Sequence, residues 1–306
     1  MKQALGLFLI SIVAIVLSFA YSDLVSSQWR FFLIGMYPAD LMHVYIISTV
    51  TLILAFFCFL RYTADTSRIT DFVLFLSLAL LSTVYLLQGI GFAGTGAISG
   101  IYISLYIGIV CNLLGTPVGY LMALLKTSSR SLTRFVATAY IEIFRGTPMV
   151  AVMFMSVYFL PALLNVKLPI FFVILLACLL CSSAYQAEVF FTGMDSKFRN
   201  HTSILKSLNI TTWRSHTKVL LPLLFTRLSM PITNQYVSIL KDSSLIIVVG
   251  VFEAFGTLRL IMGNQEWQPY FFQGFVFCIA LYMLMSSLLF MSGVFIKNAI
   301  VRSKIR

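Results

Sequence analysis

The sequence predicts an all-α polytopic membrane protein, and two features lead to this fold class. Of the 306 residues, 60% are hydrophobic and only 10% are charged, with a mean hydropathy of +0.97. A soluble domain has about a quarter of its residues charged. Nearly charge-free apolar stretches also recur, with the length of about 20 residues that a helix needs to cross a hydrocarbon core. Most of the protein surface is therefore expected to face lipid.

These stretches predict about eight membrane-spanning helices. The longest charge-free run, 72–125, is too long for one span, and the glycine-rich turn from Gly89 to Gly96 divides it into two. The segment 222–253 is apolar but is interrupted by charged residues. In chain order the predicted spans are 4–22, 41–60, 72–89, 98–125, 147–160, 169–190, 222–253 and 269–296.

The net charge of +11 follows the positive-inside rule rather than indicating a nucleic-acid partner. With the N-terminus inside, most Lys and Arg residues fall in predicted inner loops and at the chain ends. The predicted outer loops carry only Arg30, Lys167 and Arg259. This asymmetry predicts that both termini are cytoplasmic. It leaves no basic face that a nucleic acid would explain.

The glycine-rich turn is also the best internal boundary. Residues 1–97 would form three N-terminal helices with almost nothing ionisable at membrane depth, and we expect them to act as a scaffold. Residues 98–306 would form a five-helix unit with helix-breaking Pro and Gly residues and with polar residues at depth. This second unit also contains the longest predicted inner loop, 195–221.

The loop 195–221 is predicted to form a helix, a turn and a second helix. Ile204, Leu205 and Leu208 share one side of the first helix. Asn209 is suited to the left-handed position that ends a helix, and Ile210 would then contact Leu205. Such a short amphipathic helix can lie in the lipid interface or dock in a groove on a soluble partner. The rigid turn favours docking.

Polar residues inside a predicted span mark a candidate substrate path, because ionisable groups at membrane depth are costly. Lys241 and Asp242 lie in an apolar segment and, as neighbours on a helix, point in different directions. Ser243 and Ser244 follow and favour a break in the helix there. The alternative is an ion-pair network that locks helices together. The full set of predicted path residues is Asn234, Lys241, Asp242, Ser243, Ser244 and Tyr185.

A second polar group is predicted at the inner mouth of the path. Glu142 and Arg145 are three residues apart and are placed to pair on one helix face. Thr147 is placed to cap a helix that starts at Pro148. We expect Arg145 to be a structural anchor, and Glu188, near the inner end of its span, to make a helix-packing hydrogen bond.

The remaining motifs argue against metal and nucleotide sites. The five cysteines all fall inside predicted spans. We interpret them as buried packing residues and expect neither a disulfide nor a metal site. No phosphate-binding GxxxxGK[ST] motif occurs in the sequence. If ATP drives this protein, the ATPase must be a separate chain.

Several motifs, in order, resemble those of the permease subunits of polar amino acid ABC importers. The resemblance covers about 98–306, effectively the whole five-helix unit. The matching stretches are Tyr140-Ile-Glu-Ile-Phe-Arg-Gly-Thr-Pro148, Ala184-Tyr-Gln-Ala-Glu188 and Thr233-Asn-Gln-Tyr-Val-Ser-Ile-Leu-Lys-Asp-Ser-Ser-Leu245. This resemblance implies a MetI-like core of five helices, here preceded by three extra helices.

In the family that the chain resembles, the inner loop carries a motif that docks on the ATPase. Here Ser203 stands where the family usually has Glu, Ile204 and Leu205 replace two alanines, and Asn209 replaces a glycine. Trp213 matches the family pattern. The resemblance implies that 195–221 is the coupling loop, although its most typical residues are changed.

The resemblance further implies an ATP-driven importer that works by alternating access. Its partners would be a pair of ATPase subunits that bind ATP and Mg²⁺, an extracytoplasmic solute-binding protein docked on outer loops including 255–268, and a second permease chain, identical or different. This chain would bind no cofactor, perform no catalysis itself, and lie in the plasma (inner) membrane of a bacterium. The sequence leaves the transported amino acid open. It also leaves open an ion-coupled secondary transporter, with Asp242 or Glu188 as the coupling carboxylate, or a non-transporting scaffold.

Overall fold

The computed structural model describes residues 2–34, 46–51, 53–55, 58, 74, 77–78, 81–82, 100–166, 168–194 and 219–305. In this part of the chain the regular secondary structure is entirely helical, which confirms the predicted fold class. Most of the predicted spans 41–60 and 72–89 lie outside the described residues, as does most of the loop 195–221.

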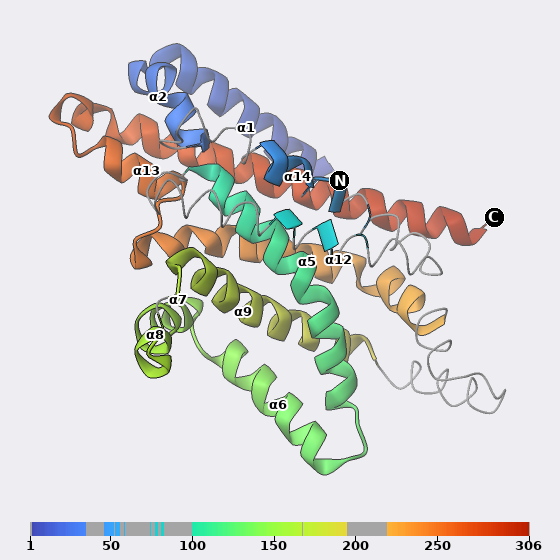
Figure 1. Cartoon of the computed structure of the whole chain (residues 1–306). Helices are drawn as coiled ribbons and strands as arrows, with labels where there is room; N and C mark the ends of the chain where they lie inside the picture. Colours follow the sequence, from blue (N-terminus) through green and yellow to red (C-terminus); the bar gives the residue numbers. More distant parts are fainter. Residues whose placement is uncertain are drawn as a thin grey trace.

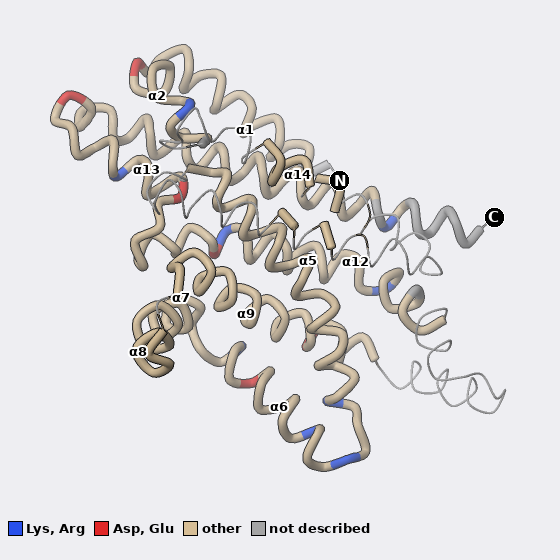
Figure 2. The backbone as a smooth tube through the Cα atoms, in the orientation of Figure 1, with Lys and Arg blue, Asp and Glu red and all other residues tan. Residues whose placement is uncertain are grey.

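The centre of the molecule is built from four long helices (Figure 1). Helix α5 (Ile101–Lys126) packs along α9 (Ile170–Gly193), and α12 (Leu221–Asp242) packs against both. Helix α14 (Phe271–Ile305) lies beside α12 on the other side. Charged residues are sparse along these helices (Figure 2), as expected for helices that face lipid and one another.

Among the described residues, three helical segments are long and apolar enough to cross a membrane. Two bent pairs pass the same test if each pair is taken as one span: Ser131–Gly146 with Met149–Leu164, and Leu223–Val249 with Ala254–Ile261. The described residues therefore hold between three and five candidate spans. This agrees with a multi-pass protein but does not confirm the predicted total of about eight.

The sequence Thr147-Pro148 produces a bend of 105° between α6 (Ser131–Gly146) and the segment Met149–Leu164, which begins with α7 (Met149–Phe154). Proline disfavours helical backbone in the residue before it, and Thr147 is extended, with φ −97° and ψ 132°. The hydroxyl of Thr147 donates to the Ile143 carbonyl, so the prediction that Thr147 caps the following helix is wrong. After α7 the chain passes through a π-helical turn, Met155–Phe159, into α8 (Leu160–Leu164).

Helix α12 changes type at Ser243, where the sequence predicts a break. It continues as a 3₁₀ helix, η4 (Ser243–Val249), which ends at Gly250 with φ +84°. The predicted outer loop 255–268 is largely helical. It contains α13 (Ala254–Ile261) and most of the 3₁₀ helix η5 (Gln265–Tyr270).

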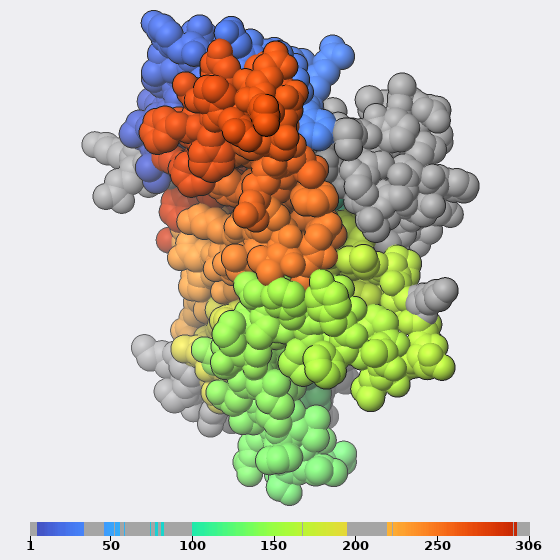
Figure 3. Space-filling model, turned by 90° about the vertical axis from the view of Figure 1, so that its left-hand side faces the viewer, coloured from blue at the N-terminus to red at the C-terminus, as the bar shows by residue number. Residues whose placement is uncertain are grey.

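The described N-terminal helices are integrated into the core. Helix α1 (Lys2–Tyr21) packs along α14, and α2 (Asp23–Ile34) contacts α5, α13 and α14 (Figure 1). Figure 3 shows α13 and the start of α14 lying against the N-terminal helices, with α6 to α8 toward the other end of the same face. The α2 side chains Leu24, Val25 and Phe32 are fully buried in one cluster with Phe277 and Leu281 of α14. The outward face of α1 exposes large apolar side chains such as Ile10 and Val16, as lipid contact requires.

Candidate functional site

A cavity of about 610 Å³ lies between α12 and α14, with contributions from α1, η4 and α13. We call it the α12–α14 cavity. Its volume is within the range of about 300–1,000 Å³ that is usual for small-molecule sites. Its polar lining residues are Asn234, Lys241, Ser244, Tyr282, Ser286 and Ser287.

The cavity brings together three of the six predicted path residues. Asn234 and Lys241 are seven residues apart, so they lie two turns apart on one face of α12. Ser244 follows in η4, and its hydroxyl donates to the Lys241 carbonyl at 2.8 Å. These three side chains all line the α12–α14 cavity.

Asp242 and Ser243 do not line this cavity. The Ser243 side chain is fully buried and its hydroxyl donates to the Leu240 carbonyl at 2.6 Å. The half-buried Asp242 carboxylate lies near Cys178 and Cys181 of α9. The Lys241 and Asp242 side chains therefore lie on different sides of α12, as expected for neighbouring positions on a helix.

Aromatic rings close one part of the α12–α14 cavity. The rings of Phe255 and Tyr282 stack with centroids 5.5 Å apart and planes inclined by 10°. The Tyr282 hydroxyl lies 2.6 Å from Glu253 Oε2, to which it donates, and 2.7 Å from the Ser104 hydroxyl of α5. These hydrogen bonds fix the ring that forms the wall.

Glu253 is a functional residue that the sequence analysis missed. It is 0% exposed and acts as the N-cap of α13, because its carboxylate accepts hydrogen bonds from the Phe255 and Gly256 N–H groups at 2.9 and 3.0 Å. The available signal was a lone carboxylate just before a short apolar helical stretch. Glu253 thereby ties α13 to Tyr282 and to the cavity wall.

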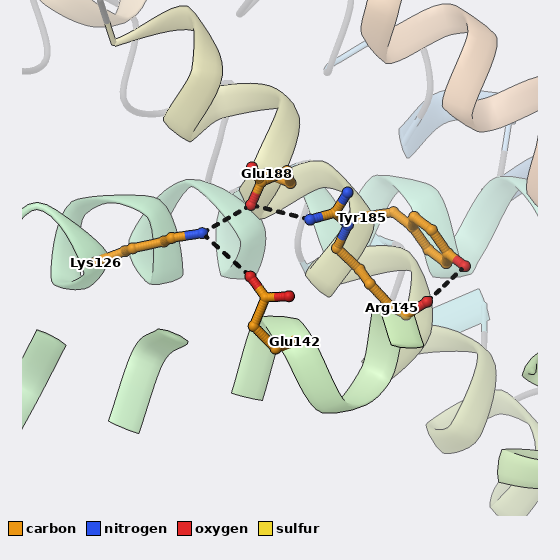
Figure 4. Close-up of polar contacts among 5 residues, drawn as sticks. All are labelled: Lys126, Glu142, Arg145, Tyr185 and Glu188. Carbon is orange, nitrogen blue, oxygen red and sulfur yellow. Dashed lines mark hydrogen bonds and ion pairs between the residues drawn. The ribbon is translucent and has the colours of Figure 1, made fainter. Parts of the chain in front are cut away.

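A second polar site is an ion cluster around Glu188 (Figure 4). Glu188 Oε2 lies 2.9 Å from Lys126 Nζ and 3.1 Å from Arg145 Nη1, and Lys126 Nζ lies 3.8 Å from Glu142 Oε1. We call these four residues the Glu188 cluster. The predicted pairing of Glu142 with Arg145 is wrong, because Arg145 reaches across to Glu188 on α9 and Glu142 faces Lys126 on α5.

Tyr185 belongs to the neighbourhood of this cluster. It lines a separate cavity of about 390 Å³ together with Arg145, Glu188, Leu228 and Gln235. Its hydroxyl donates to the Arg145 carbonyl at 3.5 Å (Figure 4). The structure therefore separates Tyr185 from Lys241, which lines the α12–α14 cavity.

A family model described as "Binding-protein-dependent transport system inner membrane component" matches residues 115–302. The chain belongs to this family. The match includes the α12 and α14 residues of the α12–α14 cavity and all four residues of the Glu188 cluster. The chain is thus the permease subunit of a transport system and, with its apolar helices, a multi-pass membrane protein.

Named relatives of this permease are similar over the same region. The inner membrane amino-acid ABC transporter permease protein YhdY of Escherichia coli is 29% identical over 170 residues, which are 55% of this chain but 46% of the relative. A putative glutamine transport system permease protein GlnP of Rickettsia typhi is 24% identical over 67% of this chain and 93% of the relative. The arginine transport system permease protein ArtQ of Bacillus subtilis is 30% identical over 50% and 70%.

A solved structure supports the fold of the permease. The crystal structure of an amino acid ABC transporter with histidines covers 64% of this chain and 90% of its own, with a TM-score of 0.56 and 22% sequence identity. The likeness therefore supports the fold over about two thirds of this chain.

A fully buried network of polar side chains holds the permease core together. Thr116 of α5 donates to Gln186 Oε1 of α9 at 2.5 Å and lies 2.7 Å from the Tyr236 hydroxyl of α12. Gln186 Nε2 in turn donates to Asn112 and Ser182. The Gln186 side chain is 0% exposed and joins α9 to α5.

The predicted coupling residues of the permease fall outside the described part of the chain. They are Ser203, Ile204, Leu205, Leu208, Asn209, Ile210 and Trp213. The predicted inner-mouth residue Pro148 is described, and it forms the N-terminal boundary of α7. Among the described residues, no group of three or more His, Cys, Asp and Glu side chains is placed to hold a metal ion.

Proposed function

We propose that this permease is the membrane-spanning subunit of an ATP-driven importer for polar amino acids. The family and the named relatives support the class of transporter, because the relatives are named for amino acid, glutamine and arginine transport. The observation that carries the proposal is the α12–α14 cavity, which brings an ammonium, an amide and several hydroxyls together between apolar helices.

Alternating access would use α12 as the moving part. This helix begins at Leu221, directly after the predicted coupling loop, and carries Asn234 and Lys241 of the cavity. A helix of 22 residues is about 33 Å long. A displacement of its inner end would therefore also move Asn234 and Lys241 at the cavity. Closure of a pair of partner ATPases on ATP would move the inner loops and open the path on one side at a time.

The partners follow from this mechanism. Two permease chains, identical or different, would enclose the path, and ATP and Mg²⁺ would be held by the ATPase subunits. With both termini in the cytoplasm of a bacterium, the segment 255–268 faces outward. An extracytoplasmic binding protein docked there would press on α13, whose Phe255 forms part of the cavity wall.

The principal alternative is an ion-coupled carrier, and the Glu188 cluster does not favour it. A coupling carboxylate must release its proton or ion during each cycle, whereas Glu188 is held by two cations, Lys126 and Arg145. Such pairing with two helices is typical of a structural carboxylate.

Isolation of the native complex tests the proposal. The chain is purified under mild conditions from its own membranes and its partners are identified by mass spectrometry. We expect an ATPase subunit with a GxxxxGK[ST] motif, and ATP hydrolysis that rises when a co-purified binding protein carries an amino acid. An intact, active complex without any ATPase would reject the proposal.

A further inference from the structure

We infer that the α12–α14 cavity binds an acidic or amide amino acid, with a carboxylate of the ligand paired to Lys241, and that it excludes basic amino acids. This inference rests on the proposed function, since it assumes that the transported solute enters this cavity. It adds the substrate class, which the relatives leave open because they are named for both glutamine and arginine transport.

The charges around the cavity carry the argument. Lys241 is the one charged residue among the described residues that line it. Its ammonium offers a charge-assisted hydrogen bond to a carboxylate, which is roughly twice as strong as a bond between neutral groups. A carboxylate that enters the cavity thus finds a partner of opposite charge.

Two carboxylates close in sequence to the cavity residues do not line the cavity. Asp242 lies toward Cys178 and Cys181 of α9. Glu253 is fully buried and receives N–H bonds from Phe255 and Gly256 as well as the Tyr282 hydroxyl. A guanidinium or a second ammonium in the cavity would meet Lys241 without a free carboxylate to balance it, and burying an unpaired charge is costly.

The neutral groups suit the rest of the ligand. Ser286 Oγ is buried and has no hydrogen-bond partner among the described residues, although buried polar groups normally have one. Together with Asn234 and Ser287 it offers oxygen acceptors to an α-ammonium and to a side-chain amide. Phe255 and Phe290 also line the cavity, and aromatic rings can make cation–π contacts with an ammonium group.

Helix α1 completes the site although it precedes the family match. Leu7 of α1 lines the cavity, and the match begins only at residue 115. Helix α1 therefore contributes a side chain to the cavity lining in addition to any scaffold role.

The test is ligand binding to the intact purified transporter in nanodiscs of phosphatidylcholine. The shift in unfolding temperature is measured with L-glutamate, L-glutamine and L-arginine, on wild type and on Lys241→Ala, Ser286→Ala and the control Lys297→Ala. Lys297 is an exposed cation of α14 outside the cavity. We expect glutamate or glutamine to bind and arginine not to bind. Lys241→Ala should weaken binding by about ten- to a hundredfold, as expected for a lost hydrogen bond to a charged group, and Lys297→Ala should change it less than twofold.

The same preparation separates this inference from the proposed function. Arginine binding equal to that of glutamate and glutamine, or unchanged binding in Lys241→Ala, would overturn the inference even if ATP-driven uptake persists. Lys241-dependent binding of glutamate or glutamine with uptake that needs no ATP would support the site and reject the importer. A Lys241-dependent shift produced only by added phosphatidylglycerol would also overturn the inference, because the cavity would then hold a lipid headgroup.

Discussion

The carboxylate of Glu188 lies 2.9 Å from the ammonium of Lys126, and this pair joins the C-terminal part of α9 to the C-terminal end of α5. Arg145 at the end of α6 adds a second ion pair to the same oxygen at 3.1 Å. The ion pair between Arg145 and Glu188 thus holds the chain directly before the Thr147-Pro148 bend to α9 (Figure 4).

Glu188→Gln should destabilise the permease, because it leaves two cations facing a neutral amide. The side chains are partly exposed, at 11% for Lys126, 26% for Glu188 and 33% for Arg145. We expect a loss of about 1–3 kcal/mol in unfolding free energy, between the values for exposed and buried pairs. The control Glu142→Gln concerns a 63% exposed side chain at 3.8 Å and should cost under about 1 kcal/mol. Equal losses in both variants would contradict this role of Glu188.

Gln186→Leu should loosen the contact between α5, α9 and α12. The substitution keeps the side-chain size but removes the hydrogen bonds that Gln186 makes with Thr116, Asn112 and Ser182. Hydrogen bonds between membrane helices contribute about 1–2 kcal/mol at most, so a comparable loss in unfolding free energy is expected. Gln268→Leu, at an exposed position of η5, serves as the control. A Gln186→Leu protein as stable as that control would show that the network contributes nothing to stability.

Gly119→Ala should separate α5 from α9. A Cβ atom at this position would lie 2.8 Å from the Ser183 carbonyl oxygen and 2.9 Å from the Ala187 nitrogen, both of which are backbone atoms. Overpacking of this kind costs about 1–3 kcal/mol. At Gly6 a Cβ would meet nothing within 4 Å, so Gly6→Ala should not destabilise the protein. The measurement is the unfolding temperature of Gly119→Ala and of Gly6→Ala. Similar values for the two variants would contradict the close approach of α5 to α9 at Gly119.

Glu253→Gln and Tyr282→Phe should each lower stability, and their effects should not add. The Tyr282 hydroxyl donates to Glu253 Oε2 at 2.6 Å, so removal of either partner removes the same bond. In a double-mutant cycle, residues in contact show coupling of about 0.5–3 kcal/mol. Tyr158→Phe, at a 58% exposed ring, is the matched control and should show no coupling to Glu253. Additive effects of the first pair would mean that this bond does not hold the cavity wall.

The local features of the fold were predictable from the sequence, because they depend on neighbouring residues. The apolar runs predict α5, α9 and α14, and adjacent positions predict that Lys241 and Asp242 diverge. The seven-residue spacing places Asn234 on the face that carries Lys241. Pro148 predicts a helix boundary, although its preceding residue ends α6 rather than capping α7.

The long-range partnerships were not predictable from the sequence. Lys126 and Glu188 are 62 residues apart and Thr116 and Gln186 are 70 apart, so only the packing of α5 on α9 brings them together. The same limit explains the wrong prediction that Glu142 pairs with Arg145. The i, i+3 spacing allows this pair, but each residue instead pairs with a residue on another helix. The sequence analysis did not single out Glu253, because its hydrogen bond to Tyr282 of α14 depends on how α13 and α14 pack.

Uptake of a radiolabelled amino acid into proteoliposomes that contain the complete native complex tests the central claim most directly. The vesicles are supplied either with internal ATP or with a proton or sodium gradient alone, and with the binding protein outside. We predict uptake that requires ATP, is blocked by vanadate and is lost when residues 203–213 of the inner loop are deleted. Equal uptake driven by an ion gradient without ATP would contradict the account.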